Sequence, residues 1–430
     1  MLKIRFKTLF LKCILGKMKR IFVIFVIFSM LIMPSQGNIE TLEINAEDYS
    51  LVIYTYESLL DDPGYDFVEA YANYSGIPES EINVVYMEDA NSIMSKAILE
   101  KDNPSADVLI GLDNIMIHEA KREAILQIYN SPTLVNISSN LITNLDSEKY
   151  LLPYDYGIIA LWFDLNRINF VTNPELEYIT LDRLLEFDLD KKLIVEDPTL
   201  SSPGLGFLLW TIAIYGDPNV DFEGVLGKDW RDWWSTAKKD LRITSSWGDA
   251  FSIYYTYEEN RPMMVSYGSS PAYDVCHPEY GVGEGNPPPS SAVVSWENPT
   301  ALQVMMSNAW LQIEGIGLVN GAPHEEEAKN FIDWFLDTDL QNNIPLNNWM
   351  YPANIHADVP SCFEANSIDP DSIYVILNDV LTPSMINDNL DYWLNEWEVE
   401  VASFGSLAIV LFSLLTGTMV YALIKRRKLT

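Results

Sequence analysis

The stretch LVIYTYESLLDDPGYDFVEAYANYSGIPESEINVVYM (51–87) decides the fold class of this chain. It opens with an apolar and aromatic run, LVIYTY (51–56), and closes with another, INVVYM (82–87), and both are typical of short buried strands. Between them, DFVEAYANYSG (66–76) has the pattern of a helix that stops at a glycine. Strand, helix and strand in this order predict a parallel sheet covered by helices.

The same alternation continues along the 430 residues, which are enough for two domains. Further strands are predicted at residues 106–114, 157–165, 191–198, 261–267 and 311–319, and further helices at residues 90–101, 118–126, 204–216 and 325–336. The fold class is therefore α/β. Ligands of such sheets bind outside the carboxyl ends of the strands, so we expect a binding cleft there.

The charge of the chain is strongly acidic and unevenly distributed. All 61 acidic residues lie within residues 39–400, which hold only 16 of the 27 lysines and arginines. Such a surface repels nucleic acid phosphates, so no nucleic acid partner is expected. It is typical of a solvated protein that charge keeps soluble.

The N-terminus has the composition of a secretory signal. Basic residues precede the apolar run IFVIFVIFSMLIM (21–33), and small residues follow it. We predict a signal peptide at residues 1–37, in which residues 1–17 are an upstream extension if translation starts at Met18. The sequence leaves open whether this signal is cleaved.

The C-terminus resembles a stop-transfer segment. Residues 401–424 carry no charge and are long enough to cross a bilayer, and residues 425–430 form a basic tail. Trp393 and Trp397 precede them, where an aromatic belt is expected. We predict an exported domain at the cell surface, anchored in the cytoplasmic membrane by residues 401–424 with the binding domain outside.

Few residues in the exported part carry catalytic or metal chemistry. Cys276 and Cys362 are its only cysteines, and the sequence leaves open whether they pair. NYS at Asn73 and NIS at Asn136 are weak glycosylation signals. No phosphate-binding Walker loop or nucleophile elbow occurs, and the histidines have no metal-ligand spacing: His118, His277, His324 and His356.

Aromatic residues at predicted strand ends and turns are the stronger signal. They are Tyr54, Tyr56, Tyr156, Trp247, Tyr267, Tyr273, Trp349 and Tyr351. Aromatic faces at the mouths of strands suit a flat or cationic ligand, and a sugar or a polyamine also fits. In VSYGSSPAY (265–273) we expect a strand that ends at Tyr267, a tight turn, and Tyr273 returning on the next segment.

Two polar stretches add candidate ligand contacts. SSPGLG (201–206) lies between a predicted strand and a helix, where free N–H groups hold an anion, but taken alone the stretch favours an ordinary helix cap. Asp89 lies between a strand end and a helix start, and it is either an N-cap or a carboxylate that accepts a hydrogen bond from an amino group.

Taken together, these stretches resemble the thiamine-binding proteins of bacterial ABC importers. The similarity runs from about Leu51 to Val399. The matching strings are YTYESL (54–59), VVYMEDANSIMSK (84–96), ADVLIGLDN (106–114), PYDYGIIALWFD (153–164), EDPTLSSPGLGFLLW (196–210), SSWGDAF (245–251), VSYGSSPAY (265–273) and IPLNNWMYPAN (344–354).

The resemblance implies a type II periplasmic-binding-protein fold, with two α/β lobes, a hinge and a ligand cleft between them. Lobe 1 would comprise residues 47–152 and about 306–345, and lobe 2 residues 153–305 and about 346–399. By analogy, Asp89 would accept from the aminopyrimidine amino group. Further ligand contacts implied by the resemblance are Tyr56, Ser201, Ser202, Gly204, Trp247, Tyr267, Tyr273 and Trp349.

The implied function is that of a solute-binding receptor, and the predicted segment at residues 401–424 would anchor this one in the membrane, unlike most family members. It would capture thiamine, thiamine monophosphate or thiamine diphosphate and deliver it to an ABC permease and its ATPase subunit, with no catalytic residue, metal or cofactor. The sequence leaves open the preferred phosphorylation state and the identity of the permease. Two alternatives stay open: the same fold binding a polyamine or ferric iron, and a thiaminase-I-like enzyme with Cys276 or Cys362 as its nucleophile.

Overall fold

The computed structural model describes residues 49–60, 65–164, 167, 180–186, 193–256, 259–276, 308–372 and 375–402. All of these residues belong to one compact unit of the chain, Ala46–Thr430. The predicted signal peptide, and the predicted anchor beyond residue 402, lie outside them. Within the described ranges, no helix is long and apolar enough to cross a membrane.

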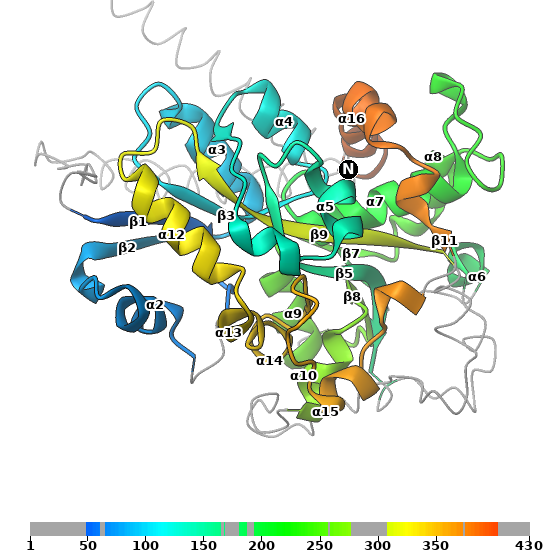
Figure 1. Cartoon of the computed structure of the whole chain (residues 1–430). Helices are drawn as coiled ribbons and strands as arrows, with labels where there is room; N and C mark the ends of the chain where they lie inside the picture. Colours follow the sequence, from blue (N-terminus) through cyan, green and yellow to red (C-terminus); the bar gives the residue numbers. More distant parts are fainter. Residues whose placement is uncertain are drawn as a thin grey trace, which may run out of the picture. The chain divides into compact units, whose positions relative to one another are not determined.

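The strands of the described residues form one mixed sheet (Figure 1). They are β1 (Leu51–Tyr56), β2 (Ile82–Met87), β3 (Val108–Asp113), β4 (Leu126–Gln127), β5 (Leu152–Phe163), β6 (Leu193–Glu196), β7 (Arg242–Thr244), β8 (Met263–Tyr267), β9 (Asn308–Val319), β10 (Tyr351–Pro352) and β11 (Val375–Ile376). The main order is β2-β1-β3-β9-β5-β8-β6-β7, with β10 beside β5, and β4 and β11 beside β9.

Among the described strands, the predicted parallel pairing occurs in the two outer parts of the main sheet order and between β9 and β11. β1 pairs in parallel with β2 and β3, and β6 pairs in parallel with β7 and β8. The two long strands between these parts, β5 and β9, run antiparallel to each other and to their neighbours β8 and β3. The sheet is thus mixed, because β9 returns to it late in the sequence.

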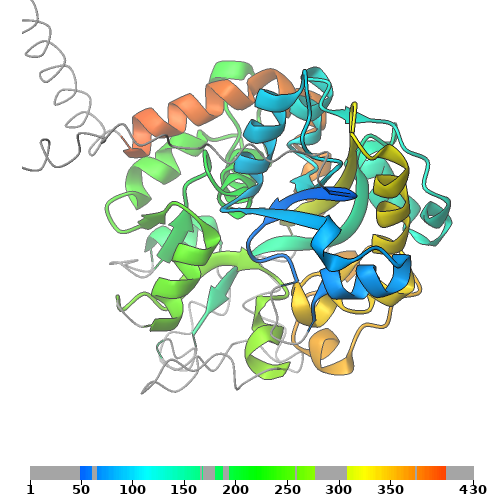
Figure 2. The same cartoon turned by 90° about the vertical axis from the view of Figure 1, so that its left-hand side faces the viewer.

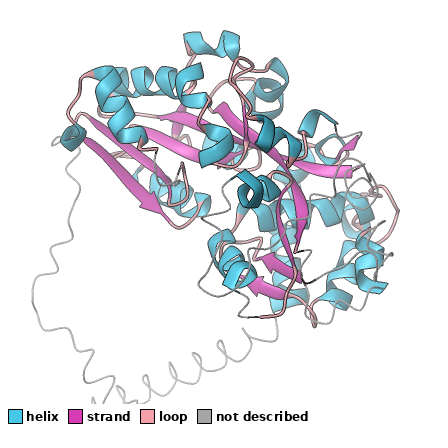
Figure 3. Cartoon of the chain, turned by 90° about the horizontal axis from the view of Figure 1, so that it is seen from below, coloured by secondary structure: helices cyan, strands magenta, loops and turns pink. Residues whose placement is uncertain are grey.

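Helices lie on both sides of the strands (Figure 3). They are α2 (Phe67–Ser75), α3 (Ala90–Glu100), α4 (Ile117–Arg122), α5 (Ser139–Asp146), α6 (Leu181–Glu186), α7 (Ser202–Tyr215), α8 (Trp230–Ala237), α9 (Trp247–Thr256), α10 (Ser270–Cys276), α12 (Glu325–Phe335), α13 (Thr338–Gln341), α14 (Ile344–Asn347), α15 (Ser361–Ala365) and α16 (Pro383–Trp397). Most predicted helices are confirmed, but α4 ends at Arg122, and Leu126 joins β4 instead.

Local sequence explains where these helices begin and end. Asp66 caps α2 by accepting from the backbone N–H groups of Val68 and Glu69, and Gly76 ends it in the left-handed conformation at φ +80°. Thr382 caps α16, whose first residue is a proline. The helix boundaries therefore follow capping residues that the sequence displays.

Two large hydrophobic cores flank the middle of the sheet. One contains β1, β3, α3 and α12, and Figures 1 and 2 show α3 and α12 on opposite sides of these strands. The other contains α7, α8 and α16. β5 and β9 contribute to both, since Ile158 and Ile313 pack in the first core while Phe163 and Trp310 pack in the second.

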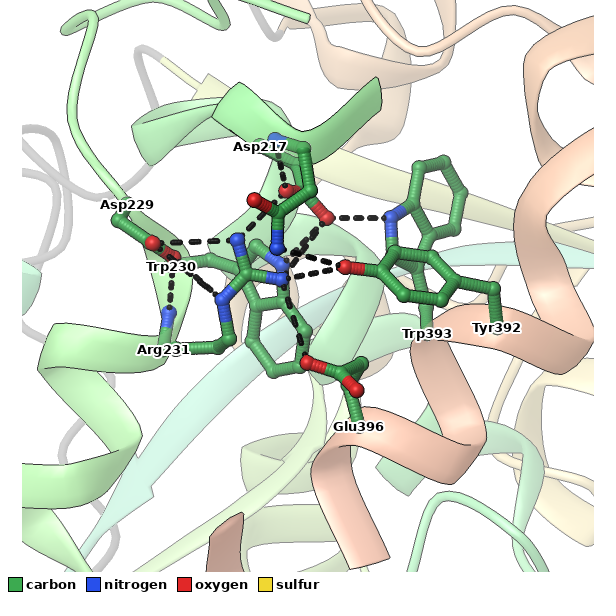
Figure 4. Close-up of polar contacts among 8 residues, drawn as sticks. Asp217, Asp229, Trp230, Arg231, Tyr392, Trp393 and Glu396 are labelled. Atoms are coloured by element: carbon green, nitrogen blue, oxygen red, sulfur yellow. Dashed lines mark hydrogen bonds and ion pairs between the residues drawn. The ribbon is translucent and has the colours of Figure 1, made fainter. Parts of the chain in front are cut away.

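Helix α16 is held against α8 by a polar cluster around Asp217 (Figure 4). Asp217 accepts from Arg231 Nη2 at 2.6 Å, from Trp393 Nε1 at 2.9 Å and from Trp230 Nε1 at 3.1 Å. Although burial raises the pKa of Asp217, the hydrogen bonds from Arg231 and Trp230 lower it overall.

The same helix corrects the expectation of an aromatic belt. Trp393 and Trp397 are fully buried in the second core, where Trp397 packs edge to face on Trp234 with ring centroids 5.7 Å apart. The expectation of an aromatic belt is therefore wrong. Both tryptophans lie on the buried face of an amphipathic helix and complete the core around α8.

Candidate ligand pocket

A pocket of about 580 Å³ opens at the carboxyl ends of the parallel strands. Its lining residues follow the ends of β1 and β2 on one side and of β6, β7 and β8 on the other. This is the position that the sequence predicts for a cleft in an α/β sheet. Eight of the residues carried over by resemblance line it: Tyr56, Asp89, Ser201, Ser202, Trp247, Tyr267, Tyr273 and Trp349.

The ninth residue, Gly204, does not line the pocket. It lies in the first turn of α7, packed against the backbone of β6. A Cβ at this position would lie only 2.5 Å from the carbonyl oxygen of Glu196. The glycine therefore allows α7 to approach β6 closely, which is a packing requirement and not a ligand contact.

Aromatic rings form one continuous wall of the pocket. Trp247 stacks on Phe251 with centroids 4.9 Å apart, Phe251 meets Tyr273 at 5.6 Å, and Tyr273 meets Trp349 at 5.0 Å. Trp247 is oriented by a hydrogen bond of 2.9 Å from its indole N–H to Ser266 Oγ. The sequence missed Phe251, since it lies within a helix and not at a strand end.

Trp349 has an unusual backbone for a bulky residue. Its φ is +57°, in the left-handed region that favours glycine. Ser269 Oγ donates to its carbonyl oxygen at 2.5 Å and helps to hold this conformation. Strain of this kind collects at binding sites, where surrounding contacts fix a side chain in the orientation needed.

Tyr273 reaches the pocket in a different way from the one expected. It does not return on an extended segment after a turn, because Ser270 begins the short helix α10, which carries Tyr273. Pro271 suits this arrangement, since the first turn of a helix needs no N–H from its second residue. The helix ends at Cys276, which forms a disulfide with Cys362 on α15.

The other predicted aromatics do not line the pocket. Tyr54 is fully buried, and its hydroxyl donates to Glu100 Oε2 at 2.8 Å. Tyr156 and Tyr351 pack against each other at 5.8 Å, beside the β5–β10 pair. Tyr54 and Tyr351 are buried core aromatics, and Tyr156 is half-buried within β5, so their sequence position alone did not distinguish them from the wall of the pocket.

A buried acidic network forms the floor of the pocket, and sequence reasoning missed it. Glu314, 8% exposed, accepts from Tyr56 Oη at 2.9 Å and from Tyr154 Oη at 2.7 Å. Gln312 joins Glu314 to Tyr267 by two hydrogen bonds of 3.0 Å. A glutamate inside the apolar strand LQIEGIGLV (311–319) is the signal that could have revealed it.

The network extends to a second carboxylate through Asn348. Asn348 Nδ2 donates to Asp155 Oδ2 at 2.6 Å and lies 3.1 Å from Tyr56 Oη. Burial raises the pKa of Asp155 well above its ordinary value, and the Glu314 carboxylate raises it further. Burial also raises the pKa of Glu314. Asp155 and Glu314 therefore tend to keep their protons, because burial disfavours the charged form of each.

The beginning of α7 adjoins another buried acid. Ser201 precedes the helix without a side-chain cap bond, and Leu205 N donates to its carbonyl oxygen at 2.8 Å. Both carboxylate oxygens of Glu196, the last residue of β6, are buried without a hydrogen-bond partner among the described residues. Burial raises the pKa of Glu196 well above its ordinary value.

Asp89 serves as a helix cap and a pocket residue together. Its Oδ1 accepts from Ser92 N at 2.7 Å and so begins α3, and the side chain also lines the pocket. The two readings left open by the sequence are therefore compatible. Within the described residues, no group of three or more histidine, cysteine or acidic side chains could hold a metal ion.

Comparison with known proteins gives one consistent result. The chain is 26% identical over 353 residues to a thiamine-binding periplasmic protein of Escherichia coli (strain K12), which covers 82% of this chain and 93% of that protein. It is 27% identical over 351 residues to the protein of the same name of Brucella suis biovar 1, and the match covers 81% of this chain and 91% of that protein. No model of a known protein family matches the sequence.

Solved structures agree with the sequence relatives. A periplasmic thiamin binding protein superposes with a TM-score of 0.62 at 26% identity, covering 82% of this chain and 96% of that one. A ferric binding protein from Campylobacter jejuni superposes with a TM-score of 0.57 at 15% identity, which supports the fold alone. The resemblance recognised in the sequence is confirmed: the chain is a homologue of thiamine-binding periplasmic proteins, with the α/β fold of periplasmic binding proteins.

Proposed function

We propose that this chain, a homologue of thiamine-binding periplasmic proteins, is an exported receptor that captures thiamine and delivers it to an ABC importer. The observation that carries this proposal is the pocket, whose walls are aromatic rings and whose floor is a buried carboxylate network. Thiamine joins an aromatic aminopyrimidine to a cationic thiazolium. Such a ligand gains from ring stacking, from cation–π attraction and from nearby acids.

The proposed roles follow from the position of each side chain. Trp247, Tyr273 and Trp349 would pack on the rings, and Asp89 would accept from the aminopyrimidine amino group. Closure of two lobes around the ligand would present the loaded receptor to the permease. We further propose that residues 1–37 direct export and that residues 401–424 anchor the chain, so that the pocket stays beside the importer.

Titration calorimetry on the purified full-length chain tests the proposal. Thiamine, its phosphates, spermidine and ferric citrate are titrated separately. Saturable heat at one thiamine per chain is expected. The proposal is falsified if no thiamine species binds, whereas tighter binding of spermidine or iron would assign the pocket to one of the alternative ligands.

The cysteine-dependent enzyme has no support in the pocket. Cys276 and Cys362 are joined in a disulfide, so neither thiol is available as a nucleophile in this state. The curated relatives are named as binding proteins. Incubation of thiamine with the chain and a nucleophilic base is expected to leave thiamine intact.

A further inference from the structure

The charged side chains that line the pocket are all of one sign. Among the described residues, no lysine, arginine or histidine lines it. The acidic lining residues are Glu57, Glu88, Asp89, Asp249 and Glu314. The described lining therefore offers no basic side chain to neutralise an anionic ligand.

Further acids lie behind the lining. Asp113 and Asp155 are fully buried, and each has one carboxylate oxygen without a hydrogen-bond partner among the described residues. No ion pair in the described part of the chain includes Asp113, Asp155 or Glu314. Buried carboxylates without a paired cation favour a positive group brought by the ligand and oppose a negative one.

The start of α7 does not offset this charge. Helix N-termini bind phosphate through free N–H groups, but here the second helical residue is Pro203, which has none. Gly204, the next possible donor, does not line the pocket. Glu196 lies against the same turn with both carboxylate oxygens unpaired by any described residue. A phosphate at Ser201 and Ser202 would thus have two hydroxyls and the backbone N–H of Ser202 as donors, but an acid close behind them.

From this distribution of charge, we infer that the pocket selects the unphosphorylated thiamine cation and discriminates against its phosphate esters. The inference rests on the proposed function and narrows it. Phosphorylation replaces the neutral hydroxyethyl end with one or two negative groups, whereas the thiazolium keeps its positive charge. The acids of the pocket attract the positive thiazolium and repel the negative phosphate groups.

Calorimetry of the full-length chain at one pH and one ionic strength tests the selectivity. Thiamine is expected to bind at least tenfold more tightly than thiamine monophosphate, and the diphosphate more weakly still. Monophosphate or diphosphate binding as tight as thiamine binding overturns this inference and leaves the proposed function standing. Binding of no thiamine species overturns both.

Two variants locate the source of the selectivity. Glu314→Gln is expected to weaken thiamine binding about tenfold and to leave the affinity for the diphosphate unchanged or raised. Glu326→Gln makes the same substitution in a side chain that is 89% exposed and outside the pocket, so it is the matched control. An equal loss for thiamine and diphosphate in Glu314→Gln would indicate a structural role and contradict the inference.

A variant that adds a positive charge tests the inference without changing the buried carboxylates. Ser58 is exposed and lines the pocket, so Ser58→Lys adds a cation at its edge without burying one. Relative to thiamine, the affinity for thiamine diphosphate should rise at least fivefold. An unchanged ratio in a chain that still binds thiamine would show that charge does not set the preference.

Discussion

The rings of Tyr273 and Trp349 meet edge to face, with centroids 5.0 Å apart and planes inclined at 74°. One ring comes from α10 and the other from the segment before β10, 76 residues later in the chain. This contact closes the aromatic wall that continues through Phe251 to Trp247. Disturbing either partner should therefore affect the whole face offered to a ligand.

Trp349→Ala should weaken thiamine binding tenfold or more. A ring that stacks on a desolvated cation contributes roughly 1–2 kcal/mol, which corresponds to about a tenfold change in affinity. Calorimetric titration of the variant measures the loss. Tyr74→Ala, which removes an aromatic that is 68% exposed and outside the pocket, is the control. Unchanged affinity in Trp349→Ala would remove this ring from the binding site.

The backbone of residue 349 gives a separate prediction about stability. Because φ is +57°, alanine at this position keeps the strain, whereas glycine relieves it. Trp349→Gly should therefore be more stable than Trp349→Ala by about 1 kcal/mol, the reverse of the usual order. Urea unfolding measures the free energy of unfolding of the two variants. If the alanine variant is the more stable one, the left-handed conformation of residue 349 is contradicted.

Much of the pocket follows from local sequence. Strand runs that end in tyrosine or an acidic residue place Tyr56, Asp89 and Tyr267 at one edge of the sheet, as the alternation of strands and helices predicts. The short helix α10 was also within reach, because Ser270 followed by Pro271 is a frequent helix start. Local signals thus suffice where one segment alone sets the position of a side chain.

The floor of the pocket did not follow from local sequence, for a physical reason. Tyr56 donates to Glu314, 258 residues away, and contacts Asn348, 292 residues away. Such contacts depend on β9 returning between β3 and β5, which no periodicity within a short window encodes. The burial of Trp393 and Trp397 was likewise not predictable from local sequence, since it depends on the core around α8.

The disulfide between Cys276 and Cys362 should support both stability and binding. It joins α10 to α15 across 86 residues, and bridges that close long loops stabilise proteins by about 2–5 kcal/mol. The double variant Cys276→Ser, Cys362→Ser should melt at a lower temperature and bind thiamine more weakly, because α10 carries Tyr273. Calorimetric melting and titration measure both. A loss of stability with unchanged affinity would show that α10 keeps its position without the bridge.

Gly204→Ala should destabilise the protein by roughly 1–3 kcal/mol. The added Cβ would meet backbone atoms of Glu196 at 2.5 Å, which cannot move aside as a flexible side chain could. Gly248→Ala is the matched control, since its nearest neighbour would be Ser246 Oγ at 3.9 Å. Chemical unfolding compares the two, and equal stabilities would refute the close packing of α7 on β6.

Thiamine binding should release protons from the floor of the pocket. Burial raises the pKa of Asp155 and of Glu314 above their ordinary values of 3.8 and 4.5, so the folded, empty protein retains protons there. Their contribution to the free energy of unfolding is fully present below those ordinary values and is lost as pH rises through the raised pKa values. A bound cation favours the ionised carboxylates and therefore drives proton loss.

The neighbouring groups do not obscure this effect. Tyr56, Tyr154 and Tyr267 face the network from β1, β5 and β8, and burial raises the pKa of each well above its ordinary value of 10.0, so they stay neutral. Burial also raises the pKa of Asp113 on β3, in part offset by backbone N–H groups. Among these groups, therefore, only the carboxylates are expected to release protons when the ligand's cation binds.

The affinity for thiamine should consequently rise as pH increases through the raised pKa values of Asp155 and Glu314. Titrations in two buffers of different ionisation enthalpy measure the number of protons released per thiamine bound. The unmodified chain should release protons, and Glu314→Gln should release fewer, because one of the two coupled carboxyls is gone. Glu326→Gln should match the unmodified chain. Proton uptake, or equal release by the unmodified chain and by Glu314→Gln, would show that Glu314 does not respond to the ligand's charge.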